Sequence, residues 1–159
     1  MNPKASFGVH TLRFAGLFNL PIPLRRFRNW SFTNHFRRKD MATSQEILEA
    51  LADYKIQCNE NKRLRKMQRD WSKLLHFVAE DTKDTFTMNV VQGEILSCES
   101  GTNGTPDIIV TTTSENFCDM FWGDLNPSQK YLAGEIRVKA SQEGIMRIDA
   151  ITMIIWPDA

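Results

Sequence analysis

The chain has 159 residues, of which 42% are hydrophobic, 25% charged and 10% aromatic, and its formal net charge is +1. These values are typical of one compact globular domain and exclude a collagen-like, repetitive or wholly disordered chain. No run of about 18 apolar residues is present, which excludes a membrane-spanning helix. The three cysteines, Cys58, Cys98 and Cys118, form no close pair. This spacing excludes a zinc site or a disulfide framework and fits a reducing compartment.

The small net charge conceals two regions of opposite charge that meet at Met41. Eight of the twenty Lys and Arg residues, but only one of the nineteen acidic residues, lie in residues 1–40. Three interpretations of this basic segment stay open: upstream sequence before a true start at Met41, an organelle transit segment, or an arm that binds anionic lipid or nucleic acid. We therefore assign residues 1–40 to a basic N-terminal extension outside the fold and residues 41–159 to the folded domain.

Two helices are predicted at the start of the domain. Thr43 and Glu46 have the spacing of a capping box, which predicts a helix beginning there. Its apolar stripe would consist of Ile47, Leu48, Leu51 and Tyr54. A second helix, over about residues 61–69, carries five basic residues. We interpret it as a solvated helix over a sheet edge, with a phosphate-binding patch as the alternative.

The hydrophobic period then changes to two, which predicts consecutive short strands. The first strand is apolar on both faces, as is typical of a strand buried on both sides, and the second alternates between apolar and polar residues. Gln92-Gly93 predicts a tight hairpin turn into the third strand. We expect three or four of these strands to form a meander. They cover residues 73–79, 85–91, 94–98 and 107–112.

Helices are predicted again after these strands. Ser114 is a favourable N-cap, and Gly123 supplies the left-handed residue that ends a helix. Asn126 followed by Pro127 predicts a further helix start. The residues expected on the buried side of that helix are Tyr131 and Leu132.

The chain closes with a strand over residues 135–140 and an apolar helix from about residue 142 to Trp156-Pro157. Strands and helices are thus segregated along the chain rather than alternating. That order predicts an α+β fold in which helices pack over one face of one sheet.

No convincing catalytic constellation is present in the domain. His76 lies on a predicted strand with no Ser or Thr marked as its nucleophilic partner, so a core histidine is the simpler interpretation. The acidic residues Glu80, Asp81 and Asp84 lack the pattern of a calcium loop and predict a solvated loop. Because the domain is net acidic and its basic helix lacks interleaved aromatic residues, nucleic acid is not an expected partner.

Apolar residues are unusually frequent between residues 117 and 156. Two interpretations are open. The side chains fill a solid core, or they enclose a cavity for an apolar ligand, lined by flexible methionines and aromatic rings.

Three segments resemble the sterol carrier protein type-two domain family. They are Asp107-Ile-Ile-Val-Thr-Thr-Thr-Ser-Glu-Asn-Phe117, Gly123-Asp-Leu-Asn-Pro127 and Tyr131-Leu-Ala-Gly-Glu-Ile-Arg-Val-Lys139. Their order and spacing match a strand, a helix, a Gly, a Pro-started helix and a strand ending in Lys. The similarity covers about residues 71–156. It departs from the family at Ala140-Ser141, where many members carry Gly.

The resemblance implies a single mostly antiparallel sheet of about five strands, covered by helices and enclosing an apolar pocket or tunnel. It further implies binding and transfer of sterols, fatty acids, fatty acyl-CoA or other lipids without chemistry, so that the protein is not an enzyme and has no cofactor or metal. The implied partners are a lipid or fatty acyl ligand, membranes in transient contact, and a lipid-metabolising enzyme. Cytoplasm is the expected location, with mitochondria as the alternative if residues 1–40 are a transit segment.

The candidate lining residues are chosen by helical or strand face. They are Phe77, Phe117, Met120, Phe121, Leu132, Ile148, Ile151 and Met153. Two alternative functions stay open: a small enzyme that uses the same cavity with His76, and an interaction module that presents lipid to a partner enzyme.

Overall fold

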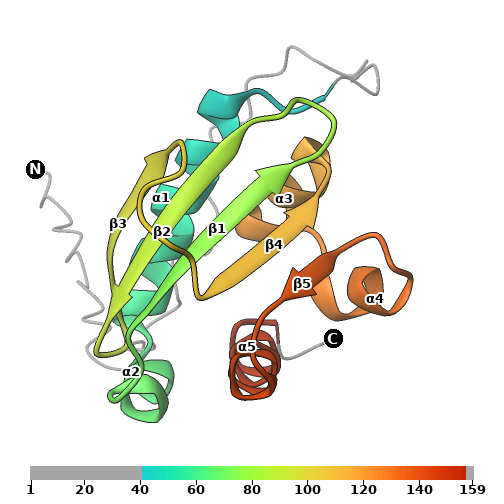
Figure 1. The fold of residues 1–159 in the computed structure, drawn as a ribbon. Helices are drawn as coiled ribbons and strands as arrows, with labels where there is room; N and C mark the ends of the chain where they lie inside the picture. The colour runs from blue at the N-terminus through green and yellow to red at the C-terminus, as the bar shows by residue number, and fades with distance from the viewer. Residues whose placement is uncertain (1–40, 157–159) are drawn as a thin grey trace, which may run out of the picture. The chain divides into compact units, whose positions relative to one another are not determined.

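The structure is a computed structural model that describes residues 41–156. The predicted extension, residues 1–40, lies outside the described residues, so its assignment stays a prediction. The elements follow in this order (Figure 1): α1 (Ser44–Glu60), α2 (Lys62–Gln68), β1 (Lys73–Ala79), β2 (Thr85–Val91), β3 (Glu94–Ser100), β4 (Ile108–Thr112), α3 (Ser114–Trp122), α4 (Pro127–Leu132), β5 (Arg137–Lys139) and α5 (Gln142–Ile155).

Strand β1 stands at the centre of a five-stranded sheet with the order β3-β2-β1-β4-β5. It pairs in parallel with β4, with Phe77 opposite Val110, and the other neighbouring pairs are antiparallel. The predicted α+β class, with a mostly antiparallel sheet of about five strands, is therefore confirmed.

The predicted meander ends at β3, because β4 lies on the far side of β1. Residues 101–107 cross the outer face of the sheet to reach that position (Figure 1). Thr87 Oγ1 donates to the carbonyl oxygen of Gly101 at 2.7 Å, and His76 Nε2 lies 3.2 Å from the carbonyl oxygen of Asn103. The two apolar faces of β1 both need cover, which a central position under this loop provides and an edge position would not.

The inner face of the sheet is covered at one end by α1 and α3, which lie behind the sheet in Figure 1. The ring of Phe77 on β1 meets Phe117 and Phe121 of α3 edge-on, with centroids 5.7 and 5.2 Å away. Phe117 is completely buried. This aromatic cluster closes the core at the α3 end and leaves the other end of the inner face to α4 and α5.

Local sequence signals set the helix ends. Thr43 and Glu46 form the predicted capping box of α1, and Gly123, with a φ of 82°, ends α3 in the left-handed conformation. The predicted N-cap of α3 is wrong by one residue. Thr113 caps the helix, and the Ser114 hydroxyl instead donates to the carboxylate of Asp81 at 2.7 Å.

Helix α4 begins at Pro127 with Asn126 as its N-cap, as predicted, but none of its residues is buried. Tyr131 and Leu132 are 45% and 85% exposed, which corrects the expectation that they face the core. A helix of six residues can contribute little packing area, and α4 lies over the edge of the core rather than on it.

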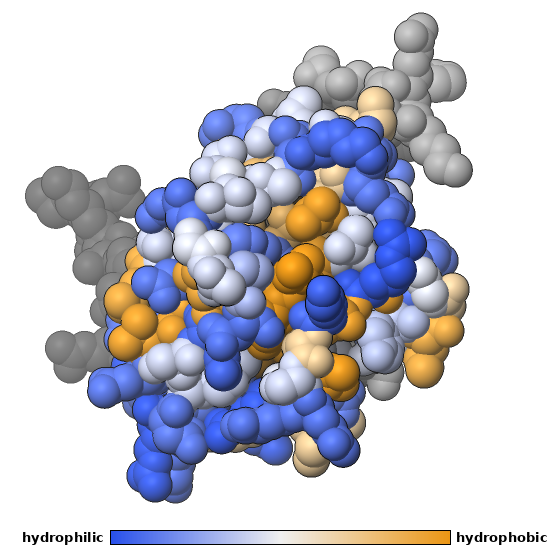
Figure 2. Space-filling view, viewed as in Figure 1, coloured by the Kyte–Doolittle hydropathy of each residue, from blue (hydrophilic) through white to orange (hydrophobic). Residues whose placement is uncertain are grey.

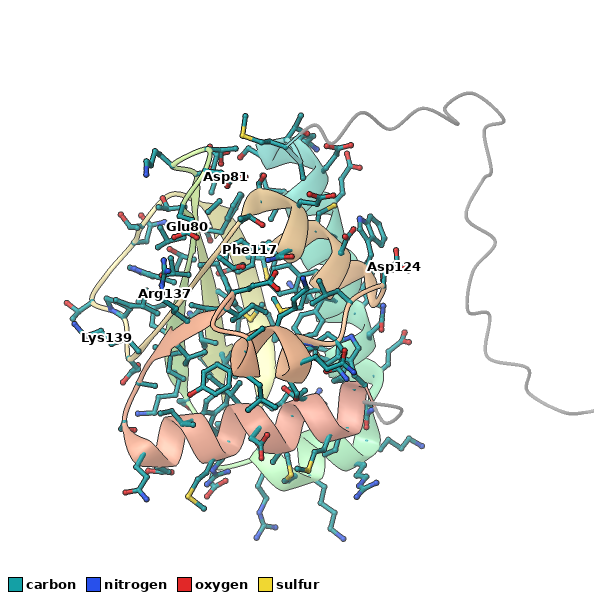
Figure 3. The ribbon with its side chains drawn as sticks, turned by 90° about the vertical axis from the view of Figure 1, so that its right-hand side faces the viewer. Glu80, Asp81, Phe117, Asp124, Arg137 and Lys139 are labelled. Carbon is teal, nitrogen blue, oxygen red and sulfur yellow. The ribbon has the colours of Figure 1, made fainter. Side chains whose placement is uncertain are left out.

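The acidic residues that follow β1 contact β5 and α3. Glu80 pairs with Arg137 of β5, and both lie on the same side of the sheet in Figure 3. Asp81 accepts hydrogen bonds from the backbone N–H and the hydroxyl of Ser114, at 2.8 and 2.7 Å. Within residues 41–156, no group of three or more His, Cys, Asp or Glu side chains is placed to hold a metal ion.

The hairpin turn at Gly93 gives a first prediction. Gly93 has a φ of 74°, and a Cβ there would stand 2.5 Å from the carbonyl oxygen of Gln68. Gly93→Ala should therefore lower the free energy of unfolding by about 2 kcal/mol or more, because strain and a backbone clash add. Gly101→Ala is the matched control, since its φ is 90° but nothing lies within 4 Å. Chemical denaturation should show a loss of about 1 kcal/mol there. Equal losses in both variants would contradict the clash.

The Asp81–Ser114 contact gives a second prediction. Burial acts to raise the pKa of Asp81, but the hydrogen bonds from Ser114 outweigh it and hold that pKa below its usual range. A depressed folded-state pKa contributes stability above the unfolded value of about 3.9, and the contribution is lost as the pH falls through the folded-state pKa. Asp81→Asn should therefore unfold at a lower urea concentration than the unmodified protein at neutral pH, and the difference should close in acid, as the pH falls through the folded-state pKa of Asp81.

The control is Asp84→Asn. The Asp84 side chain, in the same loop, makes no hydrogen bond or ion pair to any described residue. Its urea midpoint should follow that of the unmodified protein at both pH values. A gap between Asp81→Asn and the unmodified protein that persists in acid would rule out the carboxylate as the cause.

Candidate functional site

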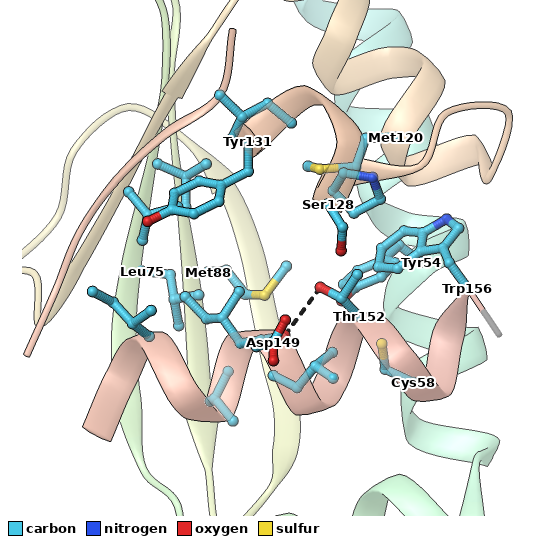
Figure 4. A pocket seen from close by; sticks show the side chains of 18 of the residues that line it. Tyr54, Cys58, Leu75, Met88, Met120, Ser128, Tyr131, Asp149, Thr152 and Trp156 are labelled. Carbon is cyan, nitrogen blue, oxygen red and sulfur yellow. Dashed lines mark hydrogen bonds between the residues drawn. The ribbon is translucent and has the colours of Figure 1, made fainter. Parts of the chain in front are cut away.

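An apolar cavity of about 410 Å³ lies against the inner face of the sheet, where α4 and α5 cover it. Figure 4 shows α5 along one side of the cavity, with the strands behind and Tyr131 of α4 on the opposite side. The volume falls within the usual range for a small-molecule site.

The walls come from every layer of the fold. The sheet contributes Leu75, Phe77, Met88, Val90, Ile95, Val110 and Val138, and α5 contributes Ile145, Met146, Ile148, Asp149, Ile151 and Thr152. The strand residues share one face because β1, β2 and β4 are in register: Leu75 lies opposite both Met88 and Ile108. The aromatic cluster at the α3 end closes the cavity on that side.

The rim of the cavity is exposed and apolar. Tyr131 and Leu132 of α4 and Ile145 and Met146 of α5 all line the cavity, and all four are exposed. Two contacts anchor α5 to the rest of the domain. Arg147 donates to both carboxylate oxygens of Asp70, at 3.1 and 3.2 Å, and Trp156 stacks on Tyr54 with ring centroids 5.9 Å apart.

The walls are almost free of charge. Among the described lining residues, Asp149 is the one charged side chain, and it is exposed. Burial raises the pKa of Tyr54 well above its usual value, and burial raises the pKa of the Cys58 thiol to about 12 despite its hydrogen bond with Tyr54. Both groups are therefore neutral near physiological pH, and Cys58 is no thiolate nucleophile. The cavity is suited to holding an apolar molecule.

Six of the eight candidate lining residues border the cavity: Phe77, Met120, Phe121, Leu132, Ile148 and Ile151. Leu132 lies at the exposed rim, and the other five lie deeper. Their contact with a ligand stays a prediction.

The other two candidates do not border the cavity. Phe117 is fully buried and stacks on Phe121 with ring centroids 5.9 Å apart. Met153 is 65% exposed. It follows Ile151 and Thr152, and at 100° per residue it points to the solvent side of α5.

Sequence reasoning missed several lining residues. Leu75, Met88 and Val90 lie on the predicted core faces of their strands, so the strand pattern contained the signal for them. Gln68 and Trp71 gave no such signal, because one ends a basic helix and the other lies in the connection to β1.

His76 lies outside the cavity. It is on β1 next to Phe77, so its side chain points to the opposite face of the sheet. There it is buried under the crossing loop, with Nε2 near the carbonyl oxygen of Asn103. The structure therefore does not support an enzyme that uses His76 in this cavity.

Within the described residues, none of the helices combines the length and the hydropathy that crossing a membrane requires.

Comparison with solved structures shows the fold. A crystal structure of sterol carrier protein 2 matches with 12% identity and a TM-score of 0.52, covering 68% of this chain and 94% of that chain. The solution structure of palmitated SCP2L2 from Aedes aegypti matches with 12% identity and a TM-score of 0.52, covering 70% and 95%. The UbiJ-SCP2 ubiquinone synthesis protein matches with 10% identity and a TM-score of 0.53, covering 70% and 97%.

The chain also spans 13% of the length of a stereoselective inverting sec-alkylsulfatase from Pseudomonas sp., at 15% identity and a TM-score of 0.44. No curated protein matches the chain significantly.

The sequence profile of the SCP-2 sterol transfer family matches residues 34–152, about three quarters of the chain. That span includes the sheet and most of α5. The resemblance found in the sequence is thereby confirmed, and the chain belongs to the SCP-2 sterol transfer family.

Proposed function

We propose that the protein binds one lipid molecule in its apolar cavity and carries it without changing it chemically. The observation that carries this proposal is the cavity of about 410 Å³, whose walls are apolar and almost uncharged. Family membership supports it, since the matching profile is that of a sterol transfer family. The ligand classes we propose are sterols and acyl lipids.

The energetics of burial are sufficient for useful affinity. A chain of ten buried CH₂ groups gains about 8 kcal/mol, at about 0.8 kcal/mol per group. The loss of translational and rotational freedom offsets a large part of this gain. The balance is compatible with a dissociation constant of about 1 μM, which lets a carrier both take up and release its cargo.

Helices α4 and α5 are the proposed gate of the cavity. Helix α4 has no buried residue, and the rim that it shares with α5 is exposed. Separation of α4 from α5 would therefore break few contacts of the core. The sheet, α1 and α3 would keep their own packing during that movement, because the cluster of Phe77, Phe117 and Phe121 does not depend on α4.

A second role, presentation of lipid to a partner enzyme, is supported by the exposed apolar rim. Tyr131, Leu132 and Met146 form a surface that a partner or a membrane could cover. A structural neighbour is named a ubiquinone synthesis protein, which fits an accessory place beside lipid-modifying enzymes.

Diphenylhexatriene, a hydrocarbon that fluoresces in apolar surroundings, tests the proposal without needing any polar contact. The protein should bind it saturably. Ile151→Trp should weaken binding about tenfold, because the larger ring occupies volume that about two buried CH₂ groups would otherwise fill. Thermal unfolding should show that the variant stays folded.

Met153→Trp is the matched control, because Met153 lies on the same helix but outside the cavity. It should bind the probe as the unmodified protein does. Absence of saturable binding by folded protein would disprove the proposed function, and equal weakening in both variants would show that the probe binds elsewhere.

A further inference from the structure

The apolar cavity has one polar place in its wall, where α4 and α5 face each other. Three polar side chains line the cavity there: Ser128 of α4 and Asp149 and Thr152 of α5. In Figure 4 the Ser128 side chain points from α4 toward α5, where Asp149 and Thr152 are labelled. We call these three residues the polar seam.

The geometry of α5 turns Asp149 toward this seam. Asp149 and Thr152 are three residues apart, so they are neighbours on one face of the helix. Ile145, four residues before Asp149, belongs to the same stripe and to the exposed rim of the cavity. Arg147, two residues before Asp149, lies on the other side of α5, where it pairs with Asp70. The basic side chain of this helix is therefore turned away from the polar seam.

The hydrogen-bonding capacity of the polar seam is mainly that of an acceptor. Thr152 Oγ1 donates its proton to the carbonyl oxygen of Ile148 at 3.0 Å, so toward a ligand it can only accept. The carboxylate of Asp149 is also an acceptor, and it makes no hydrogen bond or ion pair with another described residue. The Ser128 hydroxyl can donate or accept. A ligand group that donates hydrogen bonds fits this set.

Charge favours the same kind of ligand group. No Lys, Arg or His is among the described lining residues, and Asp149 is negative. The polar seam therefore repels a carboxylate or phosphate and attracts an ammonium group. Because Asp149 is exposed, an ammonium group beside it keeps part of its hydration and avoids the cost of burying a charge.

We propose that the polar seam binds the head group of the lipid and that this head group is a hydrogen-bond donor, the hydroxyl of a lipid alcohol or the ammonium of a long-chain amine. This inference rests on the proposed function and narrows its ligand class, because lipids with an anionic head group bind most weakly. The rest of the ligand lies along the apolar walls, and the polar seam sets its orientation.

Displacement of diphenylhexatriene by four ligands of the same chain length tests the head group. They are dodecylamine, 1-dodecanol, 2-dodecanone and dodecanoate. At neutral pH and low salt the amine should bind about tenfold tighter than dodecanoate, because attraction and repulsion by an exposed carboxylate each contribute a factor of about three. Dodecanol should bind about fivefold tighter than dodecanone, whose carbonyl can only accept.

Salt separates the two effects. At about 0.5 M salt the ratio of amine affinity to dodecanoate affinity should fall, because salt screens an exposed carboxylate. The ratio of dodecanol affinity to dodecanone affinity should stay the same, since neither ligand is charged. A purely steric preference of the cavity would not depend on salt in this way.

Variants assign the charge effect to Asp149. Asp149→Asn should lower the ratio of amine affinity to dodecanoate affinity about threefold or more. The ratio is taken within each variant, so a change of the wall that affects both ligands equally cancels. Glu143→Gln is the matched control, because it removes the same charge from the same helix, but Glu143 lies 3.7 Å from Arg147 and does not line the cavity. It should keep the ratio.

Four results would overturn the inference: an amine that binds no tighter than dodecanoate, a dodecanol that binds no tighter than dodecanone, a ratio that Asp149→Asn leaves unchanged, or an equal fall in Glu143→Gln. The order of the four ligands needs no variant, so it decides even if a substitution prevents folding. Failure of the proposed function is a different result, since folded protein would then not bind diphenylhexatriene at all.

Discussion

The central strand β1 is apolar on both faces, and the need to cover both faces determines the rest of the fold. The outer face is covered by residues 101–107, which cross from β3 to β4 and place His76 under a loop. The inner face is longer than α1 and α3 together can cover. Its remaining part receives α5, and the incomplete fit between that helix and the strands leaves the cavity.

The cavity lies at one end of the inner face because the side chains that cover the two ends differ in size. At the α3 end, three phenylalanine rings fill the space between sheet and helix. At the α5 end, the strands present Leu75, Val90 and Val110, and α5 contributes no aromatic ring to the cavity wall. Side chains of that length do not bridge the gap. The cavity is therefore a property of the fold's geometry and not of one missing side chain.

Local patterns were enough to predict the elements, and long-range contacts explain what was missed. The period-two pattern predicted β1 and β2 with the bounds that the structure shows, and Gly123 and Pro127 marked helix ends because their backbone preferences act locally. The place of β4 beside β1 could not be predicted, since the apolar pattern of a strand does not determine which other strand it pairs with. Phe117 and Phe121 share one helical stripe and both pack on Phe77, yet only Phe121 borders the cavity, and the sequence pattern does not separate them. Gln68 is buried by contact with Gly93, a residue of a distant hairpin, against the polar character of its own helix.

An apolar cavity that takes up a ligand couples ligand binding to stability. A ligand that binds only the folded state stabilises it in proportion to the logarithm of its concentration over the dissociation constant. The apolar walls contribute to that stabilisation for any chain that fits. Affinity thus comes from apolar contact along the walls, where Asp149 is the one charged side chain among the described lining residues, and walls of this kind tolerate lipids of different shape.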